Sequence, residues 1–333
     1  MRTRKWLAND NLIEAIEQLK GGEVVAFPTE TVYGLGANAR NEKAIEKIYK
    51  AKGRPSDNPL IVHFASWKQI EPYVTDVPDY VSQLMDAFSP GPITFVLKST
   101  GKVAPSVTAG LPTVGVRIPD HPVALRLLEH CPFPLAAPSA NLSGKPSPTL
   151  AQHVIDDLEG KIAGVIDGGN AKTGLESTVL DCTGPSPVIL RPGTITAKDI
   201  EKVLTGQMID TTSQEQVDSP ISPGTKYKHY APEVPLYLFI GKDQTFIREK
   251  LKSRHIGRLG FLQLDQKATL EVEKTYELGQ SNQEVAKRLY DVLRHVSKTD
   301  VDAVYCVLEG EDALSEAIVD RLKRAATYLY VED

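Results

Sequence analysis

A polar segment, Pro28–Ala37 (PTETVYGLGA), holds the first group of residues whose types allow chemistry. It places Thr29, Glu30 and Thr31 directly after an apolar run, where two hydroxyls and a carboxylate could bind a small polar substrate. Its glycines superficially match a dinucleotide-binding fingerprint, but six residues separate the run from the first glycine. The fingerprint needs that glycine in the tight turn itself, so we reject the match. A plain polar loop is the alternative interpretation.

A second segment, Lys50–Pro59 (KAKGRPSDNP), is rich in cationic side chains. Lys50, Lys52 and Arg54 alternate just beyond an expected helix, where a glycine and a proline force the chain out of helical geometry. Cations at a helix C-terminus are favoured by the helix dipole, so a solvated helix end is one interpretation. The other is a phosphate-binding cluster, in which Arg54 acts as a bidentate fork and a lysine as a point charge.

Arg117 is unusual because it lies within the otherwise apolar run Thr113–Pro119 (TVGVRIP). A buried arginine is rare unless it is paired, so it needs an anion, either an internal carboxylate or that of a substrate. His63 lies in another apolar run, where a packed, hydrogen-bonded histidine is more common than a ligand-binding one. Both residues are candidates whose role the pattern alone leaves open.

Two further segments supply hydroxyls, amides and one more arginine. They are Ala136–Thr149 (AAPSANLSGKPSPT) and Gly174–Asp181 (GLESTVLD), the second followed by LRPG. The candidates in them are Ser139, Asn141, Ser143, Ser147, Ser177 and Arg191. Such residues often only close turns, but they are also the types that the phosphates and ribose of a nucleotide require.

Several common catalytic arrangements are missing from the sequence. It contains no GxxxxGK[ST] phosphate loop, no clustered His and Cys with metal-ligand spacing, and no convincing Ser-His-Asp set. The three cysteines, Cys131, Cys182 and Cys306, lie far apart, which indicates neither a disulfide framework nor a zinc site and favours a reducing compartment. The remaining basic residues, hydroxyls and amides suit positioning and charge stabilisation at phosphorus better than covalent catalysis.

The bulk composition is that of a globular protein. The chain has 333 residues, 41% of them hydrophobic and 24% charged, and this length favours two domains. The net charge of -5 argues against a general nucleic-acid coat but allows a local basic pocket. No apolar stretch follows the basic N-terminal residues, and no run approaches the length of a membrane span. We therefore expect a cytoplasmic protein without a membrane segment.

The elements that must position these residues alternate between apolar runs and helical patterns, which predicts an α/β fold whose sheet can be mixed. Helical spacing marks Leu12–Leu19 and Ala44–Tyr49, and a capping-box signature, Thr149 with Gln152, predicts the start of another helix. The expected strands are Val24–Phe27, Leu60–Phe64, Ile93–Leu97, Val114–Ile118, Leu135–Ala137, Val165–Asp167, Thr178–Leu180 and Val188–Leu190.

The composition changes after Leu204, which predicts a domain boundary. We expect a catalytic domain over residues 1–205, a linker over 206–232 and a smaller α/β domain over 233–333. The linker is too long and polar for a packed connection, yet it contains an aromatic and basic run around Tyr227. We predict that it closes over the nucleotide site as a lid; packing between the two domains is the alternative. The expected C-terminal elements are strands Leu236–Ile240, Arg258–Leu262 and Val301–Leu308 and helices Gln244–Leu251, Gln283–Val296 and Ala313–Ala326.

Seven motifs resemble, in the same order, those of the YrdC-like family. They are PTETVYGLGA, KGRPSDNPLIVH, PGPITFVL, TAGLPTVGVRIP, APSANLSGKPSPT, ESTVLD and ILRPG, within residues 20–200. The segment Pro223–Pro232 (PGTKYKHYAP) and the α/β region after it are similar to the longer, two-domain branch of that family. The resemblance implies a twisted, mixed open sheet with flanking helices, followed by a smaller Rossmann-like α/β domain.

The resemblance also implies an ATP-using nucleotidyltransferase. The family combines L-threonine, bicarbonate or carbon dioxide, and ATP into threonylcarbamoyl-AMP and pyrophosphate, the first step of the threonylcarbamoyladenosine modification of tRNA. A separate tRNA-modifying complex uses the product, and direct tRNA binding is left open. Mg²⁺ is expected, held mainly by the phosphates. The alternatives are a carbamoyl-adenylate-forming carbamoyltransferase and an RNA-binding module, the latter disfavoured by the acidic net charge.

Matched position by position, the resemblance implies roles for individual residues. Those implied for threonine binding are Thr31, His63, Arg117, Ala137 and Ser177. Those implied for ATP binding are Lys52, Arg54, Asn58, Thr113, Ser139, Asn141, Ser147, Arg191 and Tyr227. Within these sets, Lys52 and Arg54 are expected to act on the triphosphate during catalysis, and Arg117 is expected to pair with the threonine carboxylate.

Overall fold

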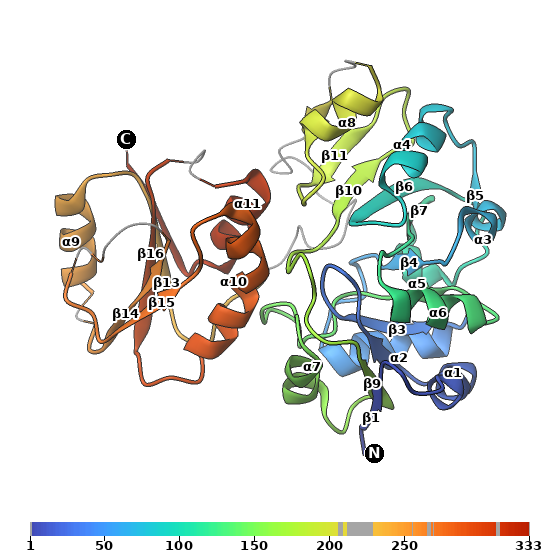
Figure 1. Cartoon of the computed structure of the whole chain (residues 1–333), viewed down its shortest axis with the longest axis horizontal. Coiled ribbons are helices and arrows are strands. Elements are labelled where there is room, and N and C mark those ends of the chain that lie inside the picture. The colour runs from blue at the N-terminus through green and yellow to red at the C-terminus, as the bar shows by residue number, and fades with distance from the viewer. Residues whose placement is uncertain are drawn as a thin grey trace. The chain divides into compact units, whose positions relative to one another are not determined.

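The computed structural model describes residues 2–205, 209–211, 229–254, 256–264, 268, 270–310 and 314–332. These residues divide into two compact units (Figure 1). The first takes its described residues from Met1–Ser143, Pro148–Lys172 and Glu176–Tyr227, and the second from Gly144–Ser147, Thr173–Leu175 and Lys228–Asp333. Most of the predicted linker, including Tyr227, lies outside the described residues. Among the helices that the structure describes, none has the length and apolarity needed to cross a membrane.

The first unit is built on one mixed sheet of twelve described strands in the order β1-β9-β2-β3-β8-β4-β7-β6-β10-β11-β12, with β5 paired to β6. β4 runs parallel to β7, and β6 runs parallel to β10, while β3 is antiparallel to both β2 and β8. The strands are β1 (Arg4–Leu7), β2 (Val25–Phe27), β3 (Gly34–Asn38), β4 (Ile61–His63), β5 (Val74–Thr75), β6 (Ile93–Ser99), β7 (Thr113–Arg117), β8 (Leu135–Ala136), β9 (Gly164–Asp167), β10 (Thr178–Asp181), β11 (Val188–Arg191) and β12 (Asp210–Thr211).

Helices flank this sheet, and α2 shows how the local sequence sets their ends. Asn41 caps α2 by accepting a hydrogen bond from the backbone N–H of Ala44, and Gly53, with φ of 62°, ends it in the left-handed conformation. The helices of the unit are α1 (Ile13–Lys20), α2 (Glu42–Lys52), α3 (Trp67–Ile70), the 3-10 helix η1 (Glu71–Tyr73), α4 (Tyr80–Phe88), α5 (Pro105–Thr108), α6 (Pro122–His130), α7 (Ala151–Leu158) and α8 (Ala197–Val203).

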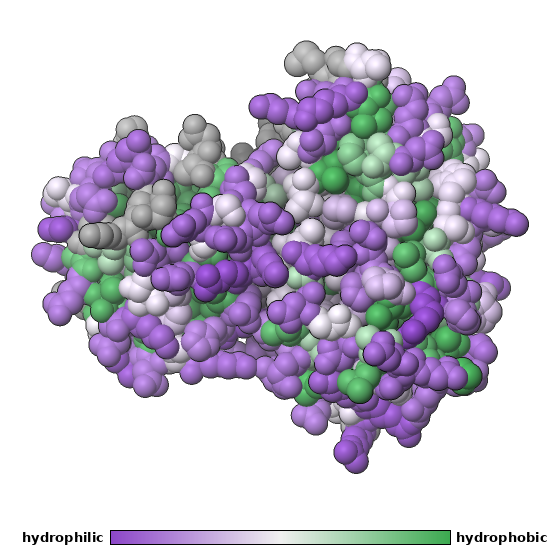
Figure 2. Space-filling view, in the orientation of Figure 1, coloured by the Kyte–Doolittle hydropathy of each residue, from purple (hydrophilic) through white to green (hydrophobic). Residues whose placement is uncertain are grey.

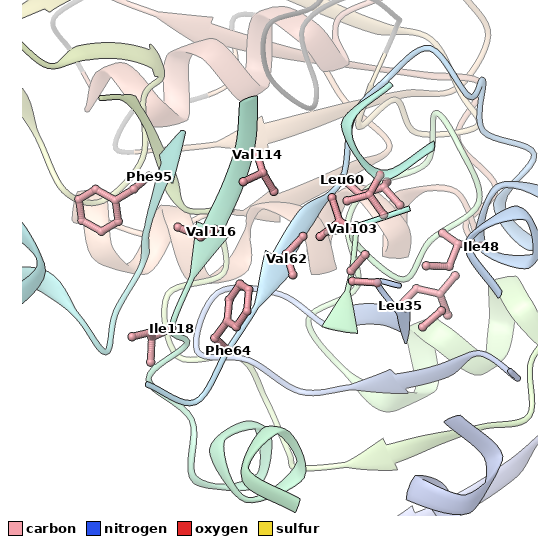
Figure 3. Packing of buried hydrophobic residues seen from close by; sticks show 14 of the residues in the cluster. Leu35, Ile48, Leu60, Val62, Phe64, Phe95, Val103, Val114, Val116 and Ile118 are labelled. Atoms are coloured by element: carbon pink, nitrogen blue, oxygen red, sulfur yellow. The ribbon is translucent and has the colours of Figure 1, made fainter. Parts of the chain in front are cut away.

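Apolar side chains cover both faces of the sheet, which is why its strands read as continuous apolar runs. Val62 of β4 and Val116 of β7 pack in one cluster (Figure 3), which also contains Ala26 of β2. Val25 and Phe27, the neighbours of Ala26 on the same strand, belong to a second cluster, because successive side chains of a strand point to opposite faces. Burying each such valine or phenylalanine contributes about 1.5–3 kcal/mol. Hydrophilic residues predominate on the visible outer surface (Figure 2).

The second unit is a smaller parallel sheet with the strand order β15-β14-β16-β13-β17. Its strands are β13 (Leu236–Ile240), β14 (Leu259–Gln263), β15 (Lys274–Glu277), β16 (Ala303–Leu308) and β17 (Tyr328–Val331). Its helices are α9 (Gln244–Lys252), α10 (Asn282–Val296) and α11 (Glu316–Ala325). The predicted fold class, a mixed α/β sheet followed by a smaller Rossmann-like α/β unit, is confirmed.

The strands that the sequence pattern missed have physical reasons in common. β1, β15 and β17 lie at the edges of their sheets. β1 and β15 each bury only one residue of four and form no apolar run, whereas the apolar β17 (YLYV) buries none of its residues. β3 (GLGAN) lacks β-branched and aromatic residues, so the pattern predicted a loop there. Its Gly36 faces Phe27, because an added Cβ would lie 2.8 Å from Cε1 of that ring. Pairing of β3 with β2 therefore depends on a glycine at this position.

The predicted capping box at Thr149 is wrong. The helix α7 begins at Ala151, with Leu150 at the N-cap position and no side-chain cap. The backbone N–H of Thr149 instead donates to His153 Nδ1 at 3.3 Å. The side chain of His153 therefore supplies the acceptor that a capping box would have taken from Gln152.

Candidate active site

The carboxyl ends of β4 and β7 place His63 and Arg117 side by side, because the two strands are parallel and these residues are register partners. Arg117 is only 5% exposed. Its Nη2 donates to Glu30 Oε1 at 2.7 Å and to Thr31 Oγ1 at 2.9 Å, and its Nε donates to the carbonyl of Gly91 at 3.3 Å. Of the two anions expected for this arginine, the structure supplies the internal carboxylate. Three residues predicted to bind threonine, Thr31, His63 and Arg117, are thus brought together.

His63 is neutral at physiological pH. Burial, and secondarily the nearby Arg117 cation, lowers the pKa of its imidazole to about 3. The ring meets Phe27 edge-on, with 5.8 Å between centroids. Among the described residues its buried Nδ1 has no hydrogen-bond partner. A buried polar atom without a partner costs about 1–3 kcal/mol, so this nitrogen is a candidate for contact with a bound ligand or water.

Ser177 is held from two sides just before β10. Its Oγ lies 2.8 Å from Thr94 Oγ1 on β6. Arg191, at the end of β11, donates from Nη2 to the Ser177 carbonyl at 2.9 Å and to Ser177 Oγ at 3.2 Å. Thr94 lies in an apolar run and was missed by the sequence prediction; a lone hydroxyl among buried apolar residues was the only available signal. Ala137, also predicted to bind threonine, follows β8 and donates its backbone N–H to Ile61 at 2.8 Å.

Gly193 keeps Ser177 in place through close packing. An added Cβ at Gly193 would lie 2.8 Å from the carbonyl carbon of Ser177 and 2.6 Å from Thr178 Oγ1. We expect Gly193→Ala to lower the free energy of unfolding by about 1–3 kcal/mol and to reduce activity by displacing Ser177. Urea unfolding and steady-state rates would measure both effects. Gly184→Ala is the matched control, because its added Cβ would come no closer than 3.6 Å to Ser186; equal effects of the two substitutions would contradict the packing argument.

Lys52 is the last residue of α2, which corrects its predicted place in a loop beyond a helix that ends near Tyr49. It is 2% exposed. Its Nζ donates to the carbonyls of Ser139 and Asn141, both at 2.6 Å, and lies 3.4 Å from Asn141 Oδ1. Ser139 Oγ also donates to Asn141 Oδ1, at 2.5 Å. The lysine thus holds the turn after β8, and the three predicted ATP-binding residues form one connected group.

The loop that follows α2 contains two more predicted ATP-binding residues. Arg54 is half-buried and donates from Nη2 to the carbonyl of Pro59 at 3.4 Å. Asn58 is fully buried, and among the described residues neither Oδ1 nor Nδ2 of its amide has a hydrogen-bond partner. A buried amide that lacks both kinds of partner is rare in native proteins. This side chain therefore indicates a site for a polar ligand in the loop.

A small cavity lies beside this loop and the neighbouring strands. Thr113, also predicted to bind ATP, lines it at the start of β7. The lining residues are Pro59, Leu60, Ile61, Thr94, Val96, Leu111, Thr113, Gly115 and Val179. Two residues predicted to bind ATP are not placed with the others. Ser147 is buried but belongs to the second unit, and Tyr227 lies outside the described residues.

Taken along the sheet, the candidate residues come from neighbouring strands or from the loops beside them, in the order β3, β8, β4, β7, β6, β10 and β11. Buried cations, hydroxyls and amides alternate along this path. Across the described part of the chain, no group of three or more His, Cys, Asp or Glu could hold a metal ion. Such a surface can bind an anionic, polar ligand and align it, and it offers charge stabilisation in place of a nucleophile.

Comparisons with known proteins cover both units. A family model described as telomere recombination (Sua5_yciO_yrdC) matches residues 17–193, and one described as the C-terminal domain of threonylcarbamoyl-AMP synthase matches residues 195–327. A threonylcarbamoyl-AMP synthase of Bacillus subtilis is 45% identical over 98% of this chain and 98% of its own length. One of Pyrococcus abyssi is 41% identical over 94% of this chain and 93% of its own. The crystal structure of P. abyssi Sua5 complexed with L-threonine matches with a TM-score of 0.90, 39% identity and coverage of 99% and 100%.

Proposed function

The chain belongs to the Sua5–YciO–YrdC family in its two-domain, threonylcarbamoyl-AMP synthase form, and from this premise we propose how its site makes the product. It is a nucleotidyltransferase that joins L-threonine, bicarbonate or carbon dioxide, and ATP into threonylcarbamoyl-AMP with release of pyrophosphate. This is the first step of the threonylcarbamoyladenosine modification of tRNA. A separate tRNA-modifying complex would take over the product.

The observation that carries the amino-acid half of the proposal is the buried group of Arg117, Thr31 and His63. An arginine in a dry site is the preferred partner of a carboxylate, and Arg117 donates no hydrogen bond from Nη1 among the described residues. A hydroxyl and a neutral imidazole beside it suit the hydroxyl of threonine, since each can accept or donate a hydrogen bond. Ala137 and Ser177 complete the proposed threonine-binding set.

We assign ATP binding to the residues around the C-terminal end of α2 and to the turn after β8, which Lys52 holds in place. Lys52 and Arg54 would neutralise the triphosphate. The amide of Asn58, which has no hydrogen-bond partner within the described ranges, would gain one from the ligand. The remaining proposed ATP-binding residues are Thr113, Ser139, Asn141, Ser147 and Arg191. Bound ATP would bring Mg²⁺ with it. Asn141 Oδ1 already accepts hydrogen bonds from Lys52 and Ser139, so this oxygen is less available as a metal ligand. The phosphates would therefore hold most of the Mg²⁺ coordination. That cation would neutralise charge on the triphosphate.

The chemistry follows from alignment. The neutral amine of threonine adds to carbon dioxide and loses one proton to solvent, which gives a carbamate. A carbamate oxygen then attacks the α-phosphate in line while pyrophosphate leaves. The site contributes orientation and fixed positive charge, which are worth most where water is excluded. The three cysteines of the chain are buried free thiols, which supports the proposed cytoplasmic location.

Pyrophosphate release tests the function. We expect the full chain to release pyrophosphate from ATP only when L-threonine and bicarbonate are both present. Release that depends on carbamoyl phosphate instead would assign the chain to the carbamoyltransferases. Binding of RNA without any cleavage of ATP would leave an RNA-binding module as the function.

A further inference from the structure

Helix α10 has two buried stripes, of which one is apolar. Val285 and Leu289 belong to the apolar stripe, which is what a helix needs to pack on its own sheet. Ala286, Tyr290 and Arg294, each four residues apart, form the other stripe and are also buried. A helix that only covers a sheet has no use for a second buried stripe. This stripe therefore indicates further packing within the second unit.

That packing involves two short segments from the polar motifs of the sequence. The second unit includes Gly144–Ser147 and Thr173–Leu175, and at both ends each segment continues into residues of the first unit. Ser147, proposed to bind ATP, is the last residue of the first segment. Ser177, proposed to bind threonine, lies just beyond the second. Each segment thus carries the backbone of the second unit to a proposed substrate-binding residue.

Arg294 holds the first segment directly before Ser147. Its Nη2 donates to the carbonyl of Pro146 at 2.5 Å, and its side chain is buried. Ser143, the residue before the segment, donates its backbone N–H to the carbonyl of Lys52 at 2.8 Å. The chain is therefore bonded to Lys52 at one end and to Arg294 at the other. Because Pro146 is the neighbour of Ser147, the bond from Arg294 fixes the backbone that carries the Ser147 hydroxyl.

Gly174 packs the second segment against the start of the same stripe. An added Cβ at Gly174 would lie 2.4 Å from the carbonyl oxygen of Ala286 and 2.6 Å from Lys287 Cα. The residue also has a φ of 79°, a conformation that favours glycine. A larger residue would have to displace this backbone from the helix, and with it the chain that leads to Ser177.

We propose that α10 positions the substrate-binding residues of both segments, with Arg294 as the positioning residue for Ser147 and Gly174 as that for Ser177. This inference rests on the proposed function and gives the second unit a part in the reaction. Each contact acts on one substrate, so loss of the Arg294 contact should raise the ATP requirement and loss of the Gly174 contact the threonine requirement. If both residues only support the fold, the two requirements should change together.

The experiment measures pyrophosphate release by the full chain at varied ATP and varied threonine. We expect Arg294→Ala to raise the ATP concentration needed for half-maximal rate by roughly tenfold, as for loss of a hydrogen bond from a charged donor, and to change the threonine requirement far less. Gly174→Ala should do the reverse, also by about tenfold, because misplacing an aligned group is costly. Arg294→Lys, which keeps a donor for Pro146, should recover part of the affinity for ATP.

A double variant shows whether Arg294 acts through Ser147. Arg294→Ala combined with Ser147→Ala should need no more ATP than Ser147→Ala alone, because coupled residues are not additive. Additive increases in the ATP requirement would contradict the positioning role of Arg294.

Two substitutions serve as matched controls. Arg288→Ala removes an exposed arginine from the same helix. Gly101→Ala imposes similar backbone strain, at a φ of 77°, where the added Cβ would point into open space among the described residues. Thermal unfolding shows which variants are folded, and the Arg294 variants test the inference even where Gly174→Ala does not fold.

Equal increases in both substrate requirements, in folded Arg294→Ala or folded Gly174→Ala, would overturn the inference. Wild-type protein that releases no pyrophosphate from ATP with threonine and bicarbonate would overturn the proposed function, and this inference with it.

Discussion

Arg117→Ala is expected to raise the threonine concentration needed for half-maximal activity by about two orders of magnitude, because it removes the cation that we assign to the substrate carboxylate. The ATP requirement should change much less. The substitution also leaves Glu30 buried without its 2.7 Å ion-pair partner, which is strongly destabilising in other proteins, by about 3–5 kcal/mol. Steady-state kinetics with varied threonine, together with urea unfolding, separate the two effects.

A double variant distinguishes lost binding from lost stability. Arg117→Met combined with Glu30→Gln removes both charges of the buried pair, and such paired replacements often restore stability. We expect the double variant to fold better than Arg117→Ala and still to require far more threonine. Arg40→Ala, a change of an exposed arginine outside the site, serves as the control. A folded Arg117→Ala variant with an unchanged threonine requirement would remove Arg117 from the site.

Lys52→Met is expected to lower both the maximal rate and the free energy of unfolding. A lysine in an exposed loop would be expected to affect the free energy of unfolding much less. The substitution keeps an apolar chain of similar length but removes the ammonium that bonds to Ser139 and Asn141 at 2.6 Å. Each buried carbonyl left without a donor costs about 1–3 kcal/mol. The turn that carries two proposed ATP-binding residues should loosen, so the ATP requirement should rise and the maximal rate fall by at least tenfold.

Arg54→Ala supplies the comparison for this prediction. Arg54 lies half-buried in the loop after α2, so we expect its loss to lower the rate while leaving the free energy of unfolding nearly unchanged. Arg54→Lys should not restore the rate if the contact with phosphate is bidentate. A Lys52→Met variant as stable as the wild type would contradict the structural role given to Lys52, and full activity in Arg54→Lys would indicate a diffuse electrostatic role for Arg54.

The fold was predictable from the sequence where the pattern was strong. Buried strands such as β4 and β7 are short apolar runs, and α2 combines an apolar stripe with an asparagine cap and a C-terminal glycine. β3 was not predictable, because its strand conformation depends on pairing with β2 and β8 and not on its own residues. The edge strands β1 and β15 were missed because each buries only one residue of four.

The site was predictable as a set of residue types but not as a set of contacts. That Arg117 needed an anion followed from its apolar neighbours, whereas its partner Glu30 is 87 positions away in the chain and no local pattern connects them. The burial of Lys52 depends on the turn after β8, 87 and 89 positions away. Such contacts arise from the order of strands in the sheet, which composition and periodicity do not specify. The individual binding roles stay predictions.

The identity of the product tests the central claim most directly. The full chain is incubated with L-threonine, ATP, Mg²⁺ and ¹³C-bicarbonate, and the nucleotide products are analysed by mass spectrometry. The account predicts threonylcarbamoyl-AMP that carries the labelled carbon, because the carbamate is made from bicarbonate before it attacks the α-phosphate. A threonyl-adenylate without the label, or an adenylate formed only when carbamoyl phosphate is supplied, would contradict it.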